Sequence, residues 1–233
     1  MNADKRRLLI VLALFLVLVG FTAPAPVYAQ ERKIEPVDEA GKDASWSAFR
    51  KRLFDALEKR DRKFVMSIVS SGVRNGSDSP RGTAEFRKQW LVDAEDSPLW
   101  DELRSALSLG SAWLVRENKR RELCAPYVLA KWPDDVDFTK NGVIVAREAL
   151  AKSEPSSGSE TLATLSYDII AVEDWELDDR DKTAKQKWVK IKLKERDAYV
   201  PEEQIRSPIE HTACFVKTTN GWRMTGFAPG GGK

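Results

Sequence analysis

The sequence has few of the residues that carry most metal and nucleophile chemistry. Among its 233 residues there are two cysteines and one histidine. One imidazole and two distant thiols are too few for a zinc site, and no acidic run has the spacing of a calcium loop. No glycine-rich phosphate loop precedes a helix either. We therefore expect no metal and no cofactor.

Support for catalysis is equally scarce. His211 and Cys214 lie three positions apart, and in a strand such residues point to opposite faces, so a nucleophile–base pair would require a bend between them. Carboxylates are plentiful in a chain that is 32% charged, and nothing singles out a pair with the spacing that glycoside hydrolysis needs. The sequence favours a protein that is not an enzyme.

An apolar run of transmembrane length is also missing. The run from Leu8 to Phe21 is shorter than the roughly 20 residues that cross a bilayer as a helix. Lys5, Arg6 and Arg7 precede it, and a cleavage pattern ending at Ala29 follows, which is the layout of a secretory signal peptide. We predict export to the periplasm or cell envelope, with no membrane association after cleavage; retention of the run as an uncleaved anchor is the alternative.

Neither sign of charge dominates the chain. It has 38 basic and 36 acidic residues, and the predicted signal peptide removes three of the former and one of the latter. The mature chain is then formally neutral, whereas nucleic-acid recognition requires a basic surface. We therefore exclude nucleic acid as a partner.

The two cysteines suit the predicted compartment. Two thiols in an exported protein are typically paired, which predicts a Cys124–Cys214 disulfide that ties the middle of the chain to its last hairpin. The alternative is two buried thiols that never meet.

The first half of the chain has a helical pattern. Trp46, Phe49, Leu53 and Leu57 share one face of a helix, and Ser97-Pro98 has the residues typical of a helix start. These and two shorter segments predict a small all-helical unit.

The second half changes to a strand pattern. Short apolar segments separated by polar loops follow Gly142, Trp188–Leu193 alternates with a period of two, and Asn220-Gly221 predicts a tight hairpin. Together the patterns predict an α+β protein. Its expected parts are a signal peptide (1–29), a flexible leader (30–44), a helical unit (45–115), a connector (116–141), a small β-barrel (142–228) and a disordered tail (229–233).

Three segments of the predicted barrel resemble the bacterial SH3 (SH3b) domain: Trp188-Val189-Lys190-Ile191, Ala198-Tyr199-Val200, and Ile205 with Ser207-Pro208. The chain departs from the family at Leu150-Ala151-Lys152, where the usual first strand has Asn-Val-Arg. The longer layout is similar to secreted bacterial proteins of unassigned function. The resemblance implies an SH3-like barrel that binds peptidoglycan or an extended peptide.

Domains of this kind hold peptides in aromatic-lined grooves, which makes Tyr167, Trp175, Trp188 and Tyr199 the candidate ligand-binding residues. Trp188, Tyr199 and Trp222 lie inside predicted strands, so a place in the core is the alternative for each of them. Trp175 lies in an acidic loop, where it is either a ligand contact or an anchor of the loop.

Three functions follow from these observations. The first is an exported, non-catalytic binding module for peptidoglycan or an extended peptide. The second is a structural or assembly factor that binds an envelope protein and has no small ligand. The third, which we do not expect, is a hydrolase that depends on Cys214 or His211.

Overall fold

A computed structural model describes residues 32–230, so the predicted signal peptide and its cleavage site lie outside the described residues. The described part is a mixed α+β structure built on a five-stranded and a seven-stranded sheet. The predicted α+β class is therefore confirmed.

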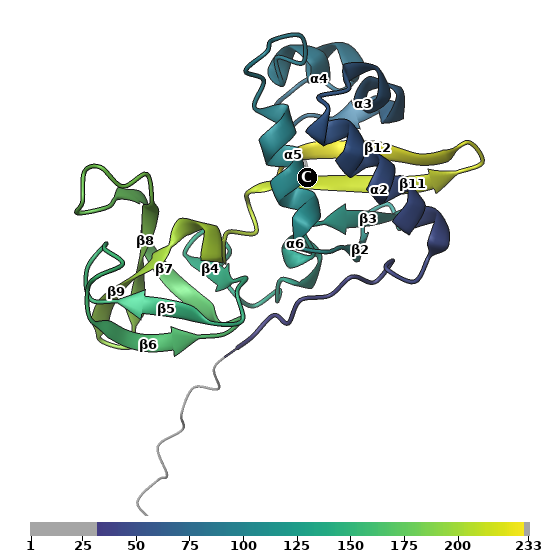
Figure 1. Cartoon of the computed structure of the whole chain (residues 1–233). Helices are drawn as coiled ribbons and strands as arrows, with labels where there is room; N and C mark the ends of the chain where they lie inside the picture. Colours follow the sequence, from purple (N-terminus) through teal and green to yellow (C-terminus); the bar gives the residue numbers. More distant parts are fainter. Residues whose placement is uncertain (1–31, 231–233) are drawn as a thin grey trace, which may run out of the picture. The chain divides into compact units, whose positions relative to one another are not determined.

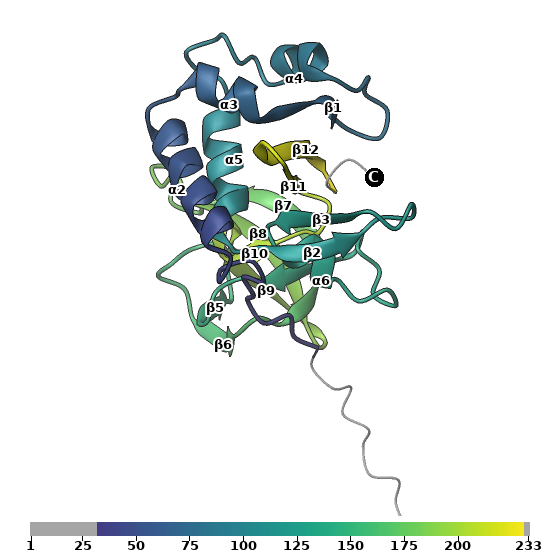
Figure 2. The same cartoon turned by 90° about the vertical axis from the view of Figure 1, so that its right-hand side faces the viewer.

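The first sheet combines strands from both ends of the described chain. Its strands are β1 (Val69–Arg74), β2 (Ala112–Val115), β3 (Arg121–Ala125), β11 (His211–Thr218) and β12 (Gly221–Pro229). They lie in the order β1-β12-β11-β3-β2, with β1 parallel to β12 and every other pair antiparallel (Figures 1 and 2). The turn between β11 and β12 falls at Asn220-Gly221 as predicted, and Gly221 adopts a φ of +98° that suits glycine.

Four helices of the described chain pack against one face of this sheet, and a short one packs against the other. The four are α2 (Ala44–Glu58), α3 (Arg62–Ile68), α4 (Thr83–Gln89) and α5 (Leu99–Ser108). The short one is α6 (Val128–Lys131), whose Val128 packs with Ala112 of β2. Helix α2 begins where Asp43 Oδ1 accepts the backbone N–H of Ser45 at 2.8 Å. The apolar faces of α2 and α5 share one core with β3, β11 and β12 (Figure 2).

The all-helical unit expected at 45–115 is not confirmed, because β1 and β2 lie within these residues. Ring centroids of Trp46 in α2 and Trp222 in β12 are 4.9 Å apart, and Trp90 stacks on Phe227 at 4.4 Å. The helices thus depend on the last hairpin for their core. Helical periodicity identifies the apolar face of a helix but not the element that covers it, which is why the sequence did not reveal this.

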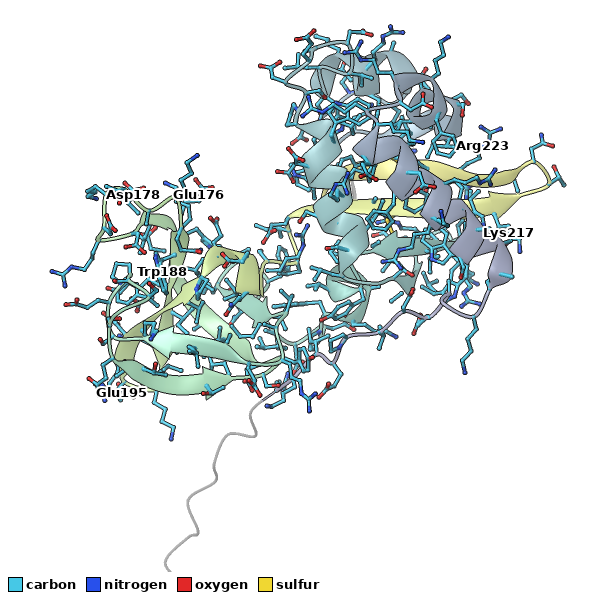
Figure 3. The ribbon with its side chains drawn as sticks, in the orientation of Figure 1. Glu176, Asp178, Trp188, Glu195, Lys217 and Arg223 are labelled. Carbon is cyan, nitrogen blue, oxygen red and sulfur yellow. A yellow bond between two sulfur atoms is a disulfide. The ribbon has the colours of Figure 1, made fainter. Side chains whose placement is uncertain are left out.

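Polar contacts reinforce the same junction. Lys217 Nζ on β11 lies 3.1 Å from Asp43 Oδ2 at the start of α2. Arg223 on β12 donates to the carbonyl of Ser67 in α3 (Figure 3). The hairpin is therefore joined to two helices by side chains on both of its strands.

The second sheet is formed by one continuous stretch of chain. Its strands are β4 (Asn141–Ile144), β5 (Ala149–Lys152), β6 (Thr161–Leu165), β7 (Ile169–Asp178), β8 (Lys187–Leu193), β9 (Arg196–Pro201) and β10 (Ile205–Arg206), with the 3₁₀ turn η1 (Glu202–Gln204) before the last. All pairs are antiparallel, in the order β10-β4-β7-β8-β9-β5-β6. Val189, Ile191, Ala198 and Val200 point into its own core, which matches the predicted alternation.

The closed SH3-like barrel is not confirmed. The second sheet is open, with β10 and β6 at its two edges. The hairpin that the sequence placed at the end of the barrel pairs instead with β3 and β1 of the first sheet. Phe215 and Met224 of this hairpin pack in the helix-covered core, so burial against helices decides which sheet the hairpin joins.

The second sheet is an insertion into the first. Strands β4 to β10 follow β3 and precede β11, yet β3 and β11 are adjacent strands. At the root of the insertion, Cys124 and Cys214 lie directly opposite one another with their Cα atoms 4.1 Å apart, and they form a disulfide. The predicted disulfide is confirmed.

Removing this disulfide should destabilise the first sheet. The two cysteines are 90 positions apart, and closing a loop of that length is worth about 4–5 kcal/mol in the chain-entropy treatment. We expect the double variant Cys124→Ala, Cys214→Ala to lose much of this free energy of unfolding in urea titrations, compared with the oxidised parent. Equal stability of the oxidised, reduced and doubly substituted proteins would contradict this.

Candidate binding cleft

The structure places the four predicted ligand-binding aromatics on different elements. Trp188 in β8 is only 1% exposed, and its Nε1 donates to Asp179 Oδ2 at 2.8 Å (Figure 3). This is the core role that the sequence left open for it. Trp222 is also buried, next to Trp46.

The other three aromatics are half-buried. Trp175 in β7 packs against the core of the second sheet. Tyr199 in β9 alternates with buried neighbours and lies opposite Lys190 of β8, so it belongs to the outer face of that sheet. Tyr167 precedes β7 with a φ of +60°, and its carbonyl accepts the N–H of Ile34. The structure does not bring these rings together in one cluster.

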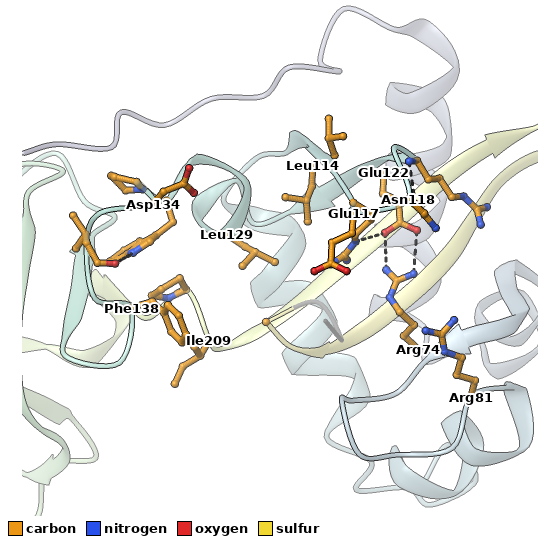
Figure 4. Close-up of a pocket in the computed structure, with 18 residues that line it drawn as sticks. Arg74, Arg81, Leu114, Glu117, Asn118, Glu122, Leu129, Asp134, Phe138 and Ile209 are labelled. Atoms are coloured by element: carbon orange, nitrogen blue, oxygen red, sulfur yellow. Dashed lines mark hydrogen bonds and ion pairs between the residues drawn. The ribbon is translucent and has the colours of Figure 1, made fainter.

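A cleft of about 640 Å³ lies elsewhere, at the root of the insertion. Its walls come from the β2–β3 hairpin, from β1 and the loop after it, and from both chain segments that connect the two sheets (Figure 4). The apolar lining includes Leu114, Val115, Leu129, Trp132, Val136, Phe138, Pro208 and Ile209. The charged lining is Arg74, Arg81, Arg116, Arg120, Glu117, Glu122 and Asp134.

Exposed apolar side chains concentrate at this cleft. Five large hydrophobic residues of the described chain are exposed, and three of them line it: Val115 at 61%, Ile209 at 46% and Phe138 at 40%. They come from three separate segments, yet the fold brings them to one place. Exposed apolar groups gathered in a hollow indicate a binding surface, whereas scattered ones do not.

Strand β3 explains why the cleft has a charged end. Its side chains alternate, so that Leu123 and Ala125 enter the helix-covered core while Glu122 and Cys124 point to the opposite face. Leu114 is the register partner of Glu122 and therefore shares that face. The first sheet thus has α2 to α5 on one side, and the cleft together with α6 on the other.

Glu122 is the centre of the charged end. Its side chain is completely buried, and Oε2 lies 2.6 Å from Arg74 Nη2 and 2.9 Å from Arg116 Nε. Burial opposes ionisation of Glu122, but the hydrogen bonds from Arg74 and Arg116 outweigh it and hold the pKa of its carboxyl below the ordinary value. The two guanidinium groups are therefore fixed around one buried carboxylate (Figure 4).

The cysteines near this cluster are not available for chemistry. Glu122, Cys124 and Cys214 come close enough for a metal ion, but both sulfur atoms belong to the disulfide and offer no thiolate. Arg116 Nη2 donates to Cys214 Sγ at 3.3 Å. Because Cys214 has no free thiol, it cannot serve as the nucleophile of the hydrolase hypothesis.

His211 has a structural setting. Its Nδ1 lies 3.2 Å from Glu102 Oε2 on α5, and its ring packs edge-on against Trp90 at 4.9 Å. The hydrogen bond to His211 lowers the pKa of Glu102, although burial of the carboxyl acts in the opposite direction. His211 is not among the residues that line the cleft.

Sequence reasoning missed the cleft because its residues lie in connections and hairpin ends. Phe138 stands between polar neighbours in a loop, and Ile209 follows Pro208 in the connection to β11. Large apolar residues in otherwise polar loops were the available signal. No periodicity relates them to Val115, however, so only the fold shows that they meet.

Comparison with known proteins identifies no relative: no family model, no curated protein and no solved structure matches the chain. Among residues 32–230, none of the helices has the length and apolar character needed to cross a bilayer.

The buried ion cluster should make stability depend on pH. The carboxyl of Glu122 has a lower pKa in the folded protein than its ordinary value of 4.5, so its contribution is complete above that value and is lost as pH falls through the folded-state pKa. We expect Glu122→Gln to cost about 3–5 kcal/mol at neutral pH, the range for breaking a buried ion pair. In urea titrations, the difference in free energy of unfolding between variant and parent should narrow as the pH falls below 4.5. A difference in free energy of unfolding that does not change with pH would contradict this prediction.

Proposed function

We propose that this chain is an exported, non-catalytic binding module of the cell envelope that recognises peptidoglycan or an extended peptide. The observation that carries the proposal is the cleft in which three of the five exposed large hydrophobics meet four arginines. A volume of about 640 Å³ lies within the roughly 300–1,000 Å³ of typical ligand sites.

The chemistry of the cleft suits an extended chain with mixed side chains. Apolar surface from Phe138 and Ile209 can cover aliphatic groups, while arginines supply charged donors for carbonyl and carboxylate oxygens. The described lining contains carboxylates and guanidinium groups but neither histidine nor cysteine. This composition supports binding better than turnover.

Two features support export. The sequence begins with the layout of a secretory signal, and the disulfide is typical of an oxidising compartment. The compartment and the ligand class together lead to peptidoglycan or envelope peptides.

We also infer that residues 142–206 are an SH3-like element in open form. The short antiparallel strands β5 to β9 and the 3₁₀ turn before β10 support this, together with the matching segments around Trp188 and Tyr199. In this view the half-buried aromatics Trp175, Tyr199 and Tyr167 are separate ligand contacts rather than one surface, and the experiments below distinguish them from the cleft.

An assembly factor that binds an envelope protein is the second candidate function. The exposed apolar residues come from three separate segments of the chain and form one surface. Such a surface also suits a folded partner, which favours this second function. Photo-crosslinking from position 138 in the intact envelope separates the two: one discrete protein adduct without sacculus binding supports the assembly factor.

Sacculus binding tests the proposal and the cleft together. We expect the mature protein to be retained by purified sacculi, and Ile209→Glu to weaken retention about tenfold or more because it places a charge where an apolar contact forms. Leu150→Glu is the matched control, since Leu150 is 44% exposed but lies on the second sheet, outside the cleft. Failure of the parent protein to bind would overturn peptidoglycan as its ligand, and equal loss in both variants would remove the cleft from the proposal.

The sequence-predicted aromatics are tested in the same assay. If these aromatics contact the ligand, Tyr199→Ala and Trp175→Ala should each reduce retention several-fold, since aromatic contacts carry much of the energy in peptide recognition. Circular dichroism checks that Trp175→Ala, which also loses core packing, remains folded. Unchanged retention in both variants would restrict recognition to the cleft.

A further inference from the structure

The cleft has two chemically different ends. Arg74 and Glu122 lie at one end, and Phe138 and Ile209 lie toward the other (Figure 4). Arg116 belongs to the first end, because its Nε lies 2.9 Å from Glu122 Oε2. Asp134 is also placed with the apolar end (Figure 4). This polarity would orient a bound chain, because a negatively charged group is attracted to the arginine end and repelled from Asp134.

The arginine end has two exposed cations. Glu122 holds the guanidinium groups of Arg74 and Arg116. Arg81 and Arg120 also line this end, are exposed, and form no ion pair with another of the described residues. An anionic group of a ligand would therefore pair with Arg81 and Arg120.

The geometry of the hairpin holds this group in place. The backbone N–H of Arg116 donates to the carbonyl of Arg120 at 2.9 Å, which pairs the two arginines across the turn between β2 and β3. Arg81 comes from the loop after β1, and its side chain is exposed. Two exposed arginines, 81 and 120, thus flank the two that Glu122 holds.

We propose that the arginine end of the cleft binds the free carboxylate of a peptide whose neighbouring apolar side chains occupy the end formed by Phe138 and Ile209. This inference rests on the proposed function and specifies its ligand: a chain with a free carboxyl end, rather than an internal segment of a longer chain or the sugar portion of peptidoglycan. Arg81 and Arg120 supply the exposed donors, and Glu122 is a positioning residue that acts through Arg74 and Arg116.

The test compares one peptide in two forms. Fluorescence anisotropy with the full mature protein measures binding of an N-terminally labelled pentapeptide of leucine, valine and alanine, ending either in a free carboxylate or in an amide. The free acid should bind about tenfold or more tightly than the amide, as expected for the loss of a charge-assisted contact.

Substitutions then assign the difference to the arginines. The double variant Arg81→Gln, Arg120→Gln should reduce affinity for the free acid to that of the amide and leave affinity for the amide unchanged. Arg121→Gln is the matched control, because Arg121 adjoins Arg120 but its guanidinium lies 4.9 Å over the ring of Trp113, outside the cleft. This control should retain the preference for the free acid.

The outcomes separate this inference from the proposed function. Equal binding of acid and amide, both abolished by Ile209→Glu, overturns the carboxylate inference and leaves the cleft as a peptide site. Absence of binding by either peptide also overturns the inference, while retention on sacculi independently decides whether peptidoglycan is the ligand. A preference for the acid that persists in the double variant overturns the assignment to Arg81 and Arg120.

Discussion

The pairing of β11 with β3 is the contact on which the rest of the structure depends. These adjacent strands are separated in the chain by the whole of the second sheet, so their alignment has to be made across a long loop. The disulfide between Cys124 and Cys214 fastens that alignment at one register position. Once β11 is in place, its hairpin partner β12 supplies Trp222 and Phe227 to the core shared with the helices. Strand β1 then pairs with the other edge of β12.

The same pairing creates the candidate site. Because β3 sends alternate side chains to opposite faces, the helices bury Leu123 while the other face carries Glu122. A buried carboxylate is costly unless it is paired, and here Arg74 from β1 and Arg116 after β2 both satisfy it. The ion cluster thereby joins elements from the two edges of the sheet and leaves arginines along the wall of the cleft.

Sequence reasoning predicted the parts that depend on local pattern. The helix face containing Trp46 and Phe49, the alternation in Trp188–Leu193, the turn at Asn220-Gly221 and the cysteine pair all appear in the structure. The partners of these elements were not predictable in the same way. The sequence pattern of the hairpin at Gly221 is the same whether the hairpin closes a barrel or completes a helix-covered sheet. Val115, Phe138 and Ile209 become neighbours only through long-range strand pairing.

The insertion is attached at two points rather than one. One connection leaves β3 through Ala125 and the other enters β11 at His211, and these two strands are held side by side. A module on a single tether can swivel about the bonds of that tether, whereas here a further segment also joins the two sheets. The N–H of Ile34 donates to the carbonyl of Tyr167 beside the second sheet, and the N–H of Glu39 donates to the carbonyl of Ser111 beside the first. Trp132 and Phe138 on the first connection and Ile209 on the second all line the cleft, so its walls belong to the anchored part of the insertion.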